Sequence, residues 1–339
     1  MLQTTKENFY RLENRLLSIN SNLDNINAMR EMIYGLVVSD KPTLIMATGG
    51  SKVVAYYLQL LLERLWPTGI ICEVIEPRDY FYKNDREEFS NLVAISASGN
   101  TNGVKDALDD FRGQKYLVCE KKQVGNYEVI SWGNEIYDTE HSFISIASSL
   151  GPISMLLDTT TVFGGYRMEI GYDEIKKVNE KITELLRRSQ EKIFNLPHSF
   201  KEDSIIHIMS GYDTKCSSRA LESNLVESGL CAPIIHDKGS FCHGRSNLTS
   251  DSTPIIYLSH DQDDLDTFLL DTISQEYETV YQLNSSDLYG ENYFWREYYL
   301  LLQMYYLSKK IAEDKDKDLT KPDYNPRLIK SLYNYRGSL

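Results

Sequence analysis

The chain has 339 residues, of which 42% are hydrophobic and 25% charged, a composition that is typical of globular proteins and excludes a disordered chain, a collagen and a coiled coil. The 36 basic and 49 acidic residues give a net charge of −13, which disfavours binding to nucleic acid or to an anionic membrane surface. No stretch approaches the roughly 18 apolar residues of a membrane helix, and the charged N-terminus lacks the apolar core of a signal peptide. We therefore expect a cytoplasmic protein, with about two domains at roughly 150 residues each.

The N-terminal half predicts an alternation of strands and helices. Apolar residues at helical spacing predict one helix from the N-terminus to about Val38. Short apolar runs then predict strands at 43–47, 69–74, 91–96, 115–119 and 142–146, and amphipathic segments predict helices at 51–65 and 103–111. A charged segment at 172–194 predicts a surface or connecting helix. This order favours a parallel sheet with helices on both faces.

The alternation restarts after Pro197, where the polar stretch 198–203 predicts a linker. Strands are predicted at 204–209, 232–235, 253–258 and 278–282, with helices at 217–228 and 294–312. The DKDKD run at 314–318 predicts a solvated turn. The sequence thus predicts two α/β domains, residues 1–196 and 197–339.

The cysteines are odd in number, widely spaced and form no Cys-x-x-Cys pair: Cys72, Cys119, Cys216, Cys231 and Cys242. This pattern disfavours a disulfide framework or a zinc ribbon and indicates reduced thiols.

Two loops that follow predicted strands combine glycine with hydroxyl side chains. The first is Thr48-Gly-Gly-Ser51 and the second is Ser96-Ala-Ser-Gly-Asn-Thr101. Unpaired N–H groups at a helix start, the positive helix end and nearby hydroxyls suit a phosphate group. The alternative is a plain helix cap in which one hydroxyl satisfies the first turn. Neither loop has the glycine pattern of a P-loop or of a dinucleotide site, so a nucleotide is not the first expectation.

A glutamate and a histidine in the second half could transfer protons. Glu227 lies at the end of a predicted helix, and His243 lies in the loop-like string Ser-Phe-Cys-His-Gly-Arg245. Carboxylate and imidazole groups are common general acids and bases. From these residues alone, a surface carboxylate and a loop histidine are the more frequent alternative. Cys242 is adjacent to His243, and adjacent side chains usually point apart, which disfavours a thiol nucleophile.

Together these motifs resemble the double sugar isomerase (SIS) domain proteins over about residues 30 to 335. The resemblance is strongest to the isomerase half of glucosamine-6-phosphate synthase and to the fructosamine-6-phosphate deglycases. Their SxSGxT phosphate loop is matched by Ser96, Ser98, Gly99 and Thr101, and their CGTS turn is matched more loosely by Gly49 and Ser51. Their sugar-contacting VAS segment corresponds to residues 146–148 and offers Ser148.

The second half carries further matches to the same proteins. Their catalytic glutamate and the histidine sixteen residues later correspond to Glu227 and His243, with Gly239 in between. Their C-terminal lysine tail is matched by Pro326-Arg-Leu-Ile-Lys-Ser331, which offers Lys330. The chain departs from the pattern at Ala97, Asn100 and Arg245, which stand where the synthase has Gln, Glu and Pro. Arg245 is a candidate contact to a second anionic group of the ligand, and a structural ion pair is the alternative.

The resemblance implies two SIS domains, each a doubly wound, flavodoxin-like α/β unit with a parallel sheet flanked by helices. It implies an aldose–ketose isomerase or a fructosamine-phosphate deglycase that acts on an open-chain sugar phosphate, without cofactor or metal. Ser51, Ser96, Ser98 and Thr101 would hold the phosphate. Glu227 would move the proton between C1 and C2, and His243 would assist ring opening. Lys330 would also promote ring opening or form a Schiff base. The resemblance also implies a homodimer with sites shared across subunits.

Without a glutaminase segment, a synthase is expected less than a deglycase or an isomerase. Two other functions stay open: a non-catalytic phosphosugar sensor, and an SIS pocket that takes another sugar-derived ligand.

Overall fold

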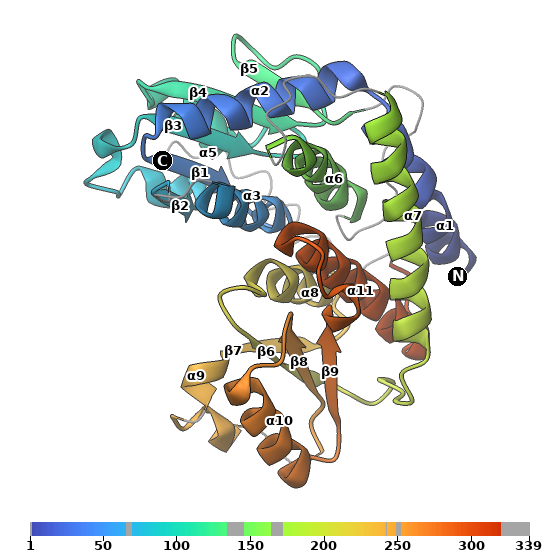
Figure 1. The fold of residues 1–339 in the computed structure, drawn as a ribbon. Coiled ribbons are helices and arrows are strands. Elements are labelled where there is room, and N and C mark those ends of the chain that lie inside the picture. The colour runs from blue at the N-terminus through green and yellow to red at the C-terminus, as the bar shows by residue number, and fades with distance from the viewer. Residues whose placement is uncertain are drawn as a thin grey trace. The chain divides into compact units, whose positions relative to one another are not determined.

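The computed structural model describes residues 2–65, 70–133, 146–163, 172–241, 243–248 and 252–319 (Figure 1). The described residues fall into two compact units. The N-terminal unit comprises those within 14–141 and 147–175, and the C-terminal unit comprises those within 1–13 and 176–320 together with Ile146. The domain boundary predicted at residues 196 and 197 stays a prediction. Within the described ranges, no helix is long and apolar enough to cross a membrane.

The N-terminal unit is built on a five-stranded parallel sheet with the order β2-β1-β3-β4-β5. The strands are β1 (Thr43–Ala47), β2 (Cys72–Ile75), β3 (Asn91–Ile95), β4 (Gln114–Cys119) and β5 (Glu128–Ser131). Every residue of β1 and β3 is buried, as expected for central strands that are covered on both faces. The order is the flavodoxin-like one, so the predicted fold is confirmed for this unit.

The helices of this part of the chain are α1 (Leu2–Asn20), α2 (Leu23–Ser39), α3 (Ser51–Leu65), α4 (Pro77–Tyr80), α5 (Asn102–Asp110) and α6 (Ile146–Phe163), with a short 3-10 turn η1 (Arg86–Glu88). The prediction of a single N-terminal helix was wrong. The chain breaks after Asn20, because the Asn22 side chain accepts a hydrogen bond of 3.2 Å from the Asn25 N–H and thereby caps a second helix.

The prediction of a strand at 142–146 was also wrong for Ile146, the one residue of that range that the structure describes. Ile146 opens the buried helix α6, and 142–145 lie outside the described residues. A short apolar run alone cannot distinguish a buried helix from a buried strand.

The C-terminal unit is built on a four-stranded parallel sheet with the order β7-β6-β8-β9. The strands are β6 (Ile205–Ser210), β7 (Ala232–Asp237), β8 (Ile255–Ser259) and β9 (Val280–Asn284). The helices are α7 (Tyr172–Phe194), α8 (Lys215–Glu227), α9 (Lys238–Phe241), α10 (Asp264–Glu276) and α11 (Tyr293–Asp314), with 3-10 turns η2 (Arg245–Leu248) and η3 (Ser286–Leu288). Helix α11 packs against α8 and is buried over most of its length, which explains its apolar and aromatic sequence.

The first four strands of each sheet are arranged in the same order. In each sheet the chain starts in the middle, adds one strand on one side and then crosses to the other side. The crossover point lies between β1 and β3 in the first sheet and between β6 and β8 in the second. Open α/β sheets bind ligands at such a point, outside the carboxyl ends of the strands. The fold therefore directs attention to the loops after β1, β3, β6 and β8.

Candidate functional site

The two glycine- and serine-containing loops begin side by side at the crossover point of the first sheet. Ala47, the last residue of β1, pairs in register with Ile95, the last residue of β3. The loops 48–51 and 96–101 therefore leave the sheet from neighbouring strand ends. This is the position at which an open α/β sheet binds a ligand.

The loop after β3 presents three hydroxyl groups. Ser96 is buried, Ser98 is exposed and Thr101 is half-buried. The Ser96 and Thr101 hydroxyl oxygens lie 3.1 Å apart in a hydrogen bond, and Ser98 Oγ accepts a hydrogen bond of 3.1 Å from the Asn100 N–H. The hydroxyls thus gather around the start of α5, where they can donate to or accept from a bound group.

The start of α5 is open to a ligand. Thr101 is the residue before the first helical position, and within the described chain its side chain makes no capping hydrogen bond. The first N–H groups of a helix need a partner, and the positive end of the helix dipole favours an anion. Lys105 adds a cation there, since its amine donates to Asn100 Oδ1 at 3.1 Å. The prediction from sequence did not include Lys105, although a lysine in the first turn after a hydroxyl-rich loop is a usable signal.

Gly99 gives this loop its shape. Its φ is +61°, a left-handed conformation that residues with a Cβ rarely adopt. A Cβ at this position would lie 2.9 Å from Val124 Cγ2 and 3.3 Å from Cys119 Sγ. Both the turn and the packing beneath the loop therefore require glycine.

The first turn of α6 lies against the loop after β1. Ser149 donates a hydrogen bond of 3.4 Å to the Gly50 carbonyl, and Ser148 is the half-buried residue before it. Gly49 has a φ of +55°, and Ser51 is the first residue of α3. The N-terminal unit thus brings together the predicted residues Gly49, Ser51, Ser96, Ser98, Gly99, Thr101 and Ser148 at one edge of the sheet.

A cavity of about 460 Å³ lies near this edge, at the carboxyl end of β2. Lys52, which directly follows Ser51, lines it and forms an ion pair with Glu76. Lys83 also lines it and forms an ion pair of 2.8 Å with Glu73. The local sequence does not predict that these charges share a cavity, because β2 and α3 are brought together only by the sheet. The cavity offers polar space next to the start of α3, and none of the described residues of the loops 48–51 and 96–101 lines it.

Glu227 is the last residue of α8 and is half-buried. Its Oε1 accepts a hydrogen bond of 2.8 Å from the Ser223 hydroxyl. Burial raises the pKa of the carboxyl above its ordinary value, and the Ser223 hydrogen bond opposes this only in part. A carboxylate with a raised pKa is a stronger base than an ordinary one, which suits a group that accepts a proton from a ligand.

His243 and Arg245 lie in the exposed turn that follows α9. The start of this segment is held firmly: Asp237 Oδ1 accepts from the Ser240 N–H at 3.0 Å, and the Lys238 amine forms a buried ion pair of 2.7 Å with Asp266. Among the described residues, Arg245 makes one hydrogen bond, of 3.5 Å, to the Ile235 carbonyl, and no ion pair. Its guanidinium is exposed to solvent and keeps N–H donors that can bind a ligand.

A single C-terminal unit does not bring Glu227 and His243 together. Four residues separate the end of α8 from the start of β7, whereas His243 follows the carboxyl end of the same strand. Six residues at roughly 3.3 Å each place about 20 Å of strand between these two backbone positions. Lys330 lies outside the described residues, so its position relative to either group is not part of the structure.

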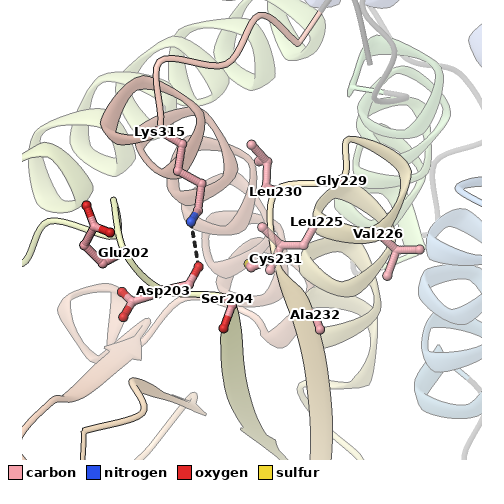
Figure 2. A pocket seen from close by; sticks show the side chains of 10 residues that line it. All are labelled: Glu202, Asp203, Ser204, Leu225, Val226, Gly229, Leu230, Cys231, Ala232 and Lys315. Carbon is pink, nitrogen blue, oxygen red and sulfur yellow. Dashed lines mark hydrogen bonds between the residues drawn. The ribbon is translucent and has the colours of Figure 1, made fainter. Parts of the chain in front are cut away.

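The end of α8 also borders a second cavity, of about 570 Å³, at the amino edge of the second sheet (Figure 2). Leu225, Val226 and residues 229–232 form its apolar part, and Lys315 donates a hydrogen bond of 2.6 Å to the Asp203 carbonyl at its rim. Glu227 is not among the residues that line this cavity. Burial raises the pKa of the Cys231 thiol in its wall to about 12, which makes that thiol unreactive at neutral pH.

By sequence, the chain matches no protein-family profile and no curated protein. By structure, it is similar to proteins of phosphosugar metabolism. Glucosamine-6-phosphate deaminase from Thermotoga maritima superposes with a TM-score of 0.70 at 14% identity, over 95% of this chain and 98% of that one. The C-terminal domain of glucosamine-fructose-6-phosphate aminotransferase from Francisella tularensis gives a TM-score of 0.64 at 14% identity, over 94% and 98% of the two chains.

A proposed phosphosugar isomerase from Bacillus subtilis gives a TM-score of 0.64 at 13% identity, over 89% of this chain and 98% of that one. These similarities extend along nearly the whole of each neighbour and include both sheets. They confirm the fold that the resemblance to double SIS proteins implied.

Proposed function

We propose that this chain, which has the fold of phosphosugar isomerases along almost its whole length, binds a sugar phosphate at the crossover point of its first sheet. The observation that carries this proposal is the loop after β3. There, Ser96, Ser98 and Thr101 surround the open N-terminus of α5. Backbone N–H groups, hydroxyls and the helix dipole are together a suitable set of partners for a phosphate.

The rest of the sugar would extend from the phosphate toward the loop after β1 and the first turn of α6. Ser51 and Ser148 supply polar contacts on that side. The cavity beside Lys52 leaves space for a further group attached to the sugar. This arrangement supports a ligand larger than inorganic phosphate.

The proposed reaction is a proton transfer between C1 and C2 of an open-chain sugar phosphate or of its amine adduct. Glu227 is the proposed base, since burial raises its pKa and, among the described residues, its carboxylate accepts one hydrogen bond, from the Ser223 hydroxyl. His243 is the proposed acid and base for ring opening. Because β7 separates it from Glu227 within one chain, we propose that it acts in the site of a second copy. Lys330 is proposed as a further ring-opening group.

A phosphosugar sensor without catalysis is the second candidate. The observation that favours it is the separation of Glu227 from His243 along β7, which leaves a single chain without an assembled acid–base pair. The two candidates share the phosphate site and differ in turnover. A chain that binds sugar phosphates with full affinity and never converts them would be a sensor.

The test is a thermal-shift panel of aldose, ketose and fructosamine phosphates on the purified protein. A ligand at 100 times its dissociation constant stabilises the folded state by about 2.7 kcal/mol. The double variant Ser98→Ala/Thr101→Ala is expected to lose that shift. The matched control Thr272→Ala/Ser286→Ala removes two exposed hydroxyls from the C-terminal unit and should keep it. No shift with any phosphosugar would contradict the proposal.

A further inference from the structure

The crossover point of the second sheet is built differently from that of the first. His260 directly follows β8, as Ser96 directly follows β3, and α8 follows β6 as α3 follows β1. The crossover point of the second sheet, however, is closed to solvent. His260 is 3% exposed, and the Glu297 side chain, which reaches the same place from α11, is fully buried.

The Glu297 carboxylate occupies the N-terminus of α8. Its Oε1 accepts two hydrogen bonds of 2.9 Å from Ser217, one from the backbone N–H and one from the hydroxyl. Ser217 is the third residue of α8, and Thr214, which precedes the helix, makes no side-chain capping bond within the described chain. An N–H group of the first turn and the positive helix end attract anions. Here the anion comes from a residue that lies 80 positions further along the chain.

The second carboxylate oxygen faces His260. Glu297 Oε2 lies 2.9 Å from His260 Nε2 but makes no hydrogen bond within the described chain, whereas the same ring nitrogen lies within hydrogen-bond reach of the Asp213 carbonyl, at 3.2 Å. On the other side of the ring, His260 Nδ1 lies 2.8 Å from the Ser285 hydroxyl. The Tyr293 hydroxyl donates to the same Asp213 carbonyl, and the tyrosine ring packs edge-on against His260.

The carboxylate therefore occupies a position that suits a small anion, with hydrogen bonds to one oxygen and an imidazole beside the other. Around the carboxylate lie the backbone N–H and the hydroxyl of Ser217, from α8, and the imidazole of His260, from the end of β8. These two segments meet α11 at the carboxyl edge of the sheet. A local helix cap would need only one side chain next to the helix start. The long-range origin of the carboxylate and the oriented imidazole distinguish this site from an ordinary cap.

We propose that the crossover point of the second sheet is an anion-binding site that the protein fills with its own Glu297 carboxylate. In the wild-type chain this site is closed to external ligands. Removal of the Glu297 carboxylate opens it to a small carboxylate. The proposal concerns the C-terminal unit only and does not depend on the function proposed for the first sheet.

The test is chemical rescue of Glu297→Ala by acetate. This substitution removes Cγ and the carboxylate group, and acetate consists of the same atoms. Thermal unfolding is measured in sodium acetate and in sodium chloride at equal ionic strength. At ten times its dissociation constant, acetate should raise the folding equilibrium constant of the variant about 11-fold. The corresponding rise in Tm is roughly 3 °C, and the wild-type protein should show none.

Two control variants separate anion binding from general effects of acetate. Leu300→Ala removes a fully buried apolar side chain from the same helix. Because a cavity left by an apolar side chain has no hydrogen-bond donor to replace, acetate should leave the Tm of this variant unchanged. Glu297→Gln keeps an oxygen that can accept from Ser217 and fills the site, so acetate should not stabilise it. An acetate shift that is equal in Glu297→Ala and Leu300→Ala would overturn the proposal. A Glu297→Ala chain that stays unfolded in acetate while Leu300→Ala folds would do the same.

Discussion

The hydroxyl oxygens of Ser96 and Thr101 lie 3.1 Å apart, one at the end of β3 and the other at the start of α5. This hydrogen bond closes the loop between them and directs Ser98 outward to solvent. The loop is therefore shaped before any ligand arrives, and binding does not have to order it. A preorganised loop reduces the entropic cost of binding.

Substitution of Gly99 should disrupt this loop. Gly99→Ala places a Cβ 2.9 Å from Val124 Cγ2 in a residue with φ of +61°, so both backbone strain and a steric clash result. We expect a loss of about 2–4 kcal/mol in the free energy of unfolding, measured with urea, together with loss of any sugar-phosphate shift. Gly125→Ala is the matched control. Its φ is +54°, but its Cβ would meet only ordinary contacts from 3.4 Å, so it should cost about 1–2 kcal/mol and keep ligand binding.

Glu227→Gln should abolish turnover while it preserves binding. Loss of a general base typically lowers the turnover rate, and we expect kcat of Glu227→Gln to fall by about 10²–10⁴-fold. Because burial raises the pKa of Glu227, the acid limb of the wild-type kcat/KM profile should lie above pH 4.5. Glu222→Gln on the same helix, where Glu222 pairs with Arg219, should leave both the rate and the profile unchanged. Equal activity of Glu227→Gln and wild type toward a turned-over substrate would exclude Glu227 as the base.

The buried imidazole pair in the second sheet should make the protein acid-sensitive. His207 Nδ1 and His236 Nε2 lie 2.7 Å apart, and both rings are almost fully buried. Burial, with the nearby His236, lowers the pKa of His207 from 6.5 to about 4. The unfolded chain therefore binds a proton that the folded chain does not, so stability falls as pH decreases from about 6.5 to about 4.

The expected loss from His207 is about 3 kcal/mol across that range, seen as a shift of the urea midpoint between pH 7 and pH 4. His207→Leu should flatten this dependence. His243→Gln, which changes an exposed histidine, should leave the dependence as it is in the wild type. A wild-type midpoint that does not move between pH 7 and pH 4 would refute this account of the pair.

Breaking the buried ion pair between Lys238 and Asp266 should lower the free energy of unfolding strongly. Both residues are less than a tenth exposed, and Tyr257 also donates to the same carboxylate oxygen. Asp266→Ala leaves the Lys238 charge buried without its partner, so we expect a loss of about 3–5 kcal/mol in the free energy of unfolding.

Two comparisons check this expectation by chemical denaturation. Lys238→Met/Asp266→Ala removes both charges and should recover part of the loss. Glu191→Ala breaks an ion pair with Arg187 in which both side chains are more than half exposed, and it should cost less than about 1 kcal/mol. If Asp266→Ala were no more destabilising than Glu191→Ala, the pair would not anchor the segment before His243.

Local patterns in the sequence were enough to predict the parallel sheets and the two loops after β1 and β3. A buried strand, a glycine and a group of hydroxyls at its end, and a following helix are all determined by neighbouring residues, and the resemblance to SIS proteins rests on those same stretches. The edge strand β5 and the helices α6 and α10 were missed. In α6, residues 149–159 are buried on every side of the helix, so the sequence shows little helical periodicity.

The closed site around Glu297 could not be predicted from local pattern. Its carboxylate, the Ser217 N–H and the His260 ring come from α11, α8 and the end of β8, and they meet only when the sheet and its helices pack together. Glu297 also lies within an apolar and aromatic helix, where a glutamate carries no signal of a specific partner. A hydrogen bond between residues 80 positions apart depends on the packing of the whole unit, whereas a loop at the end of a strand depends on its own few residues.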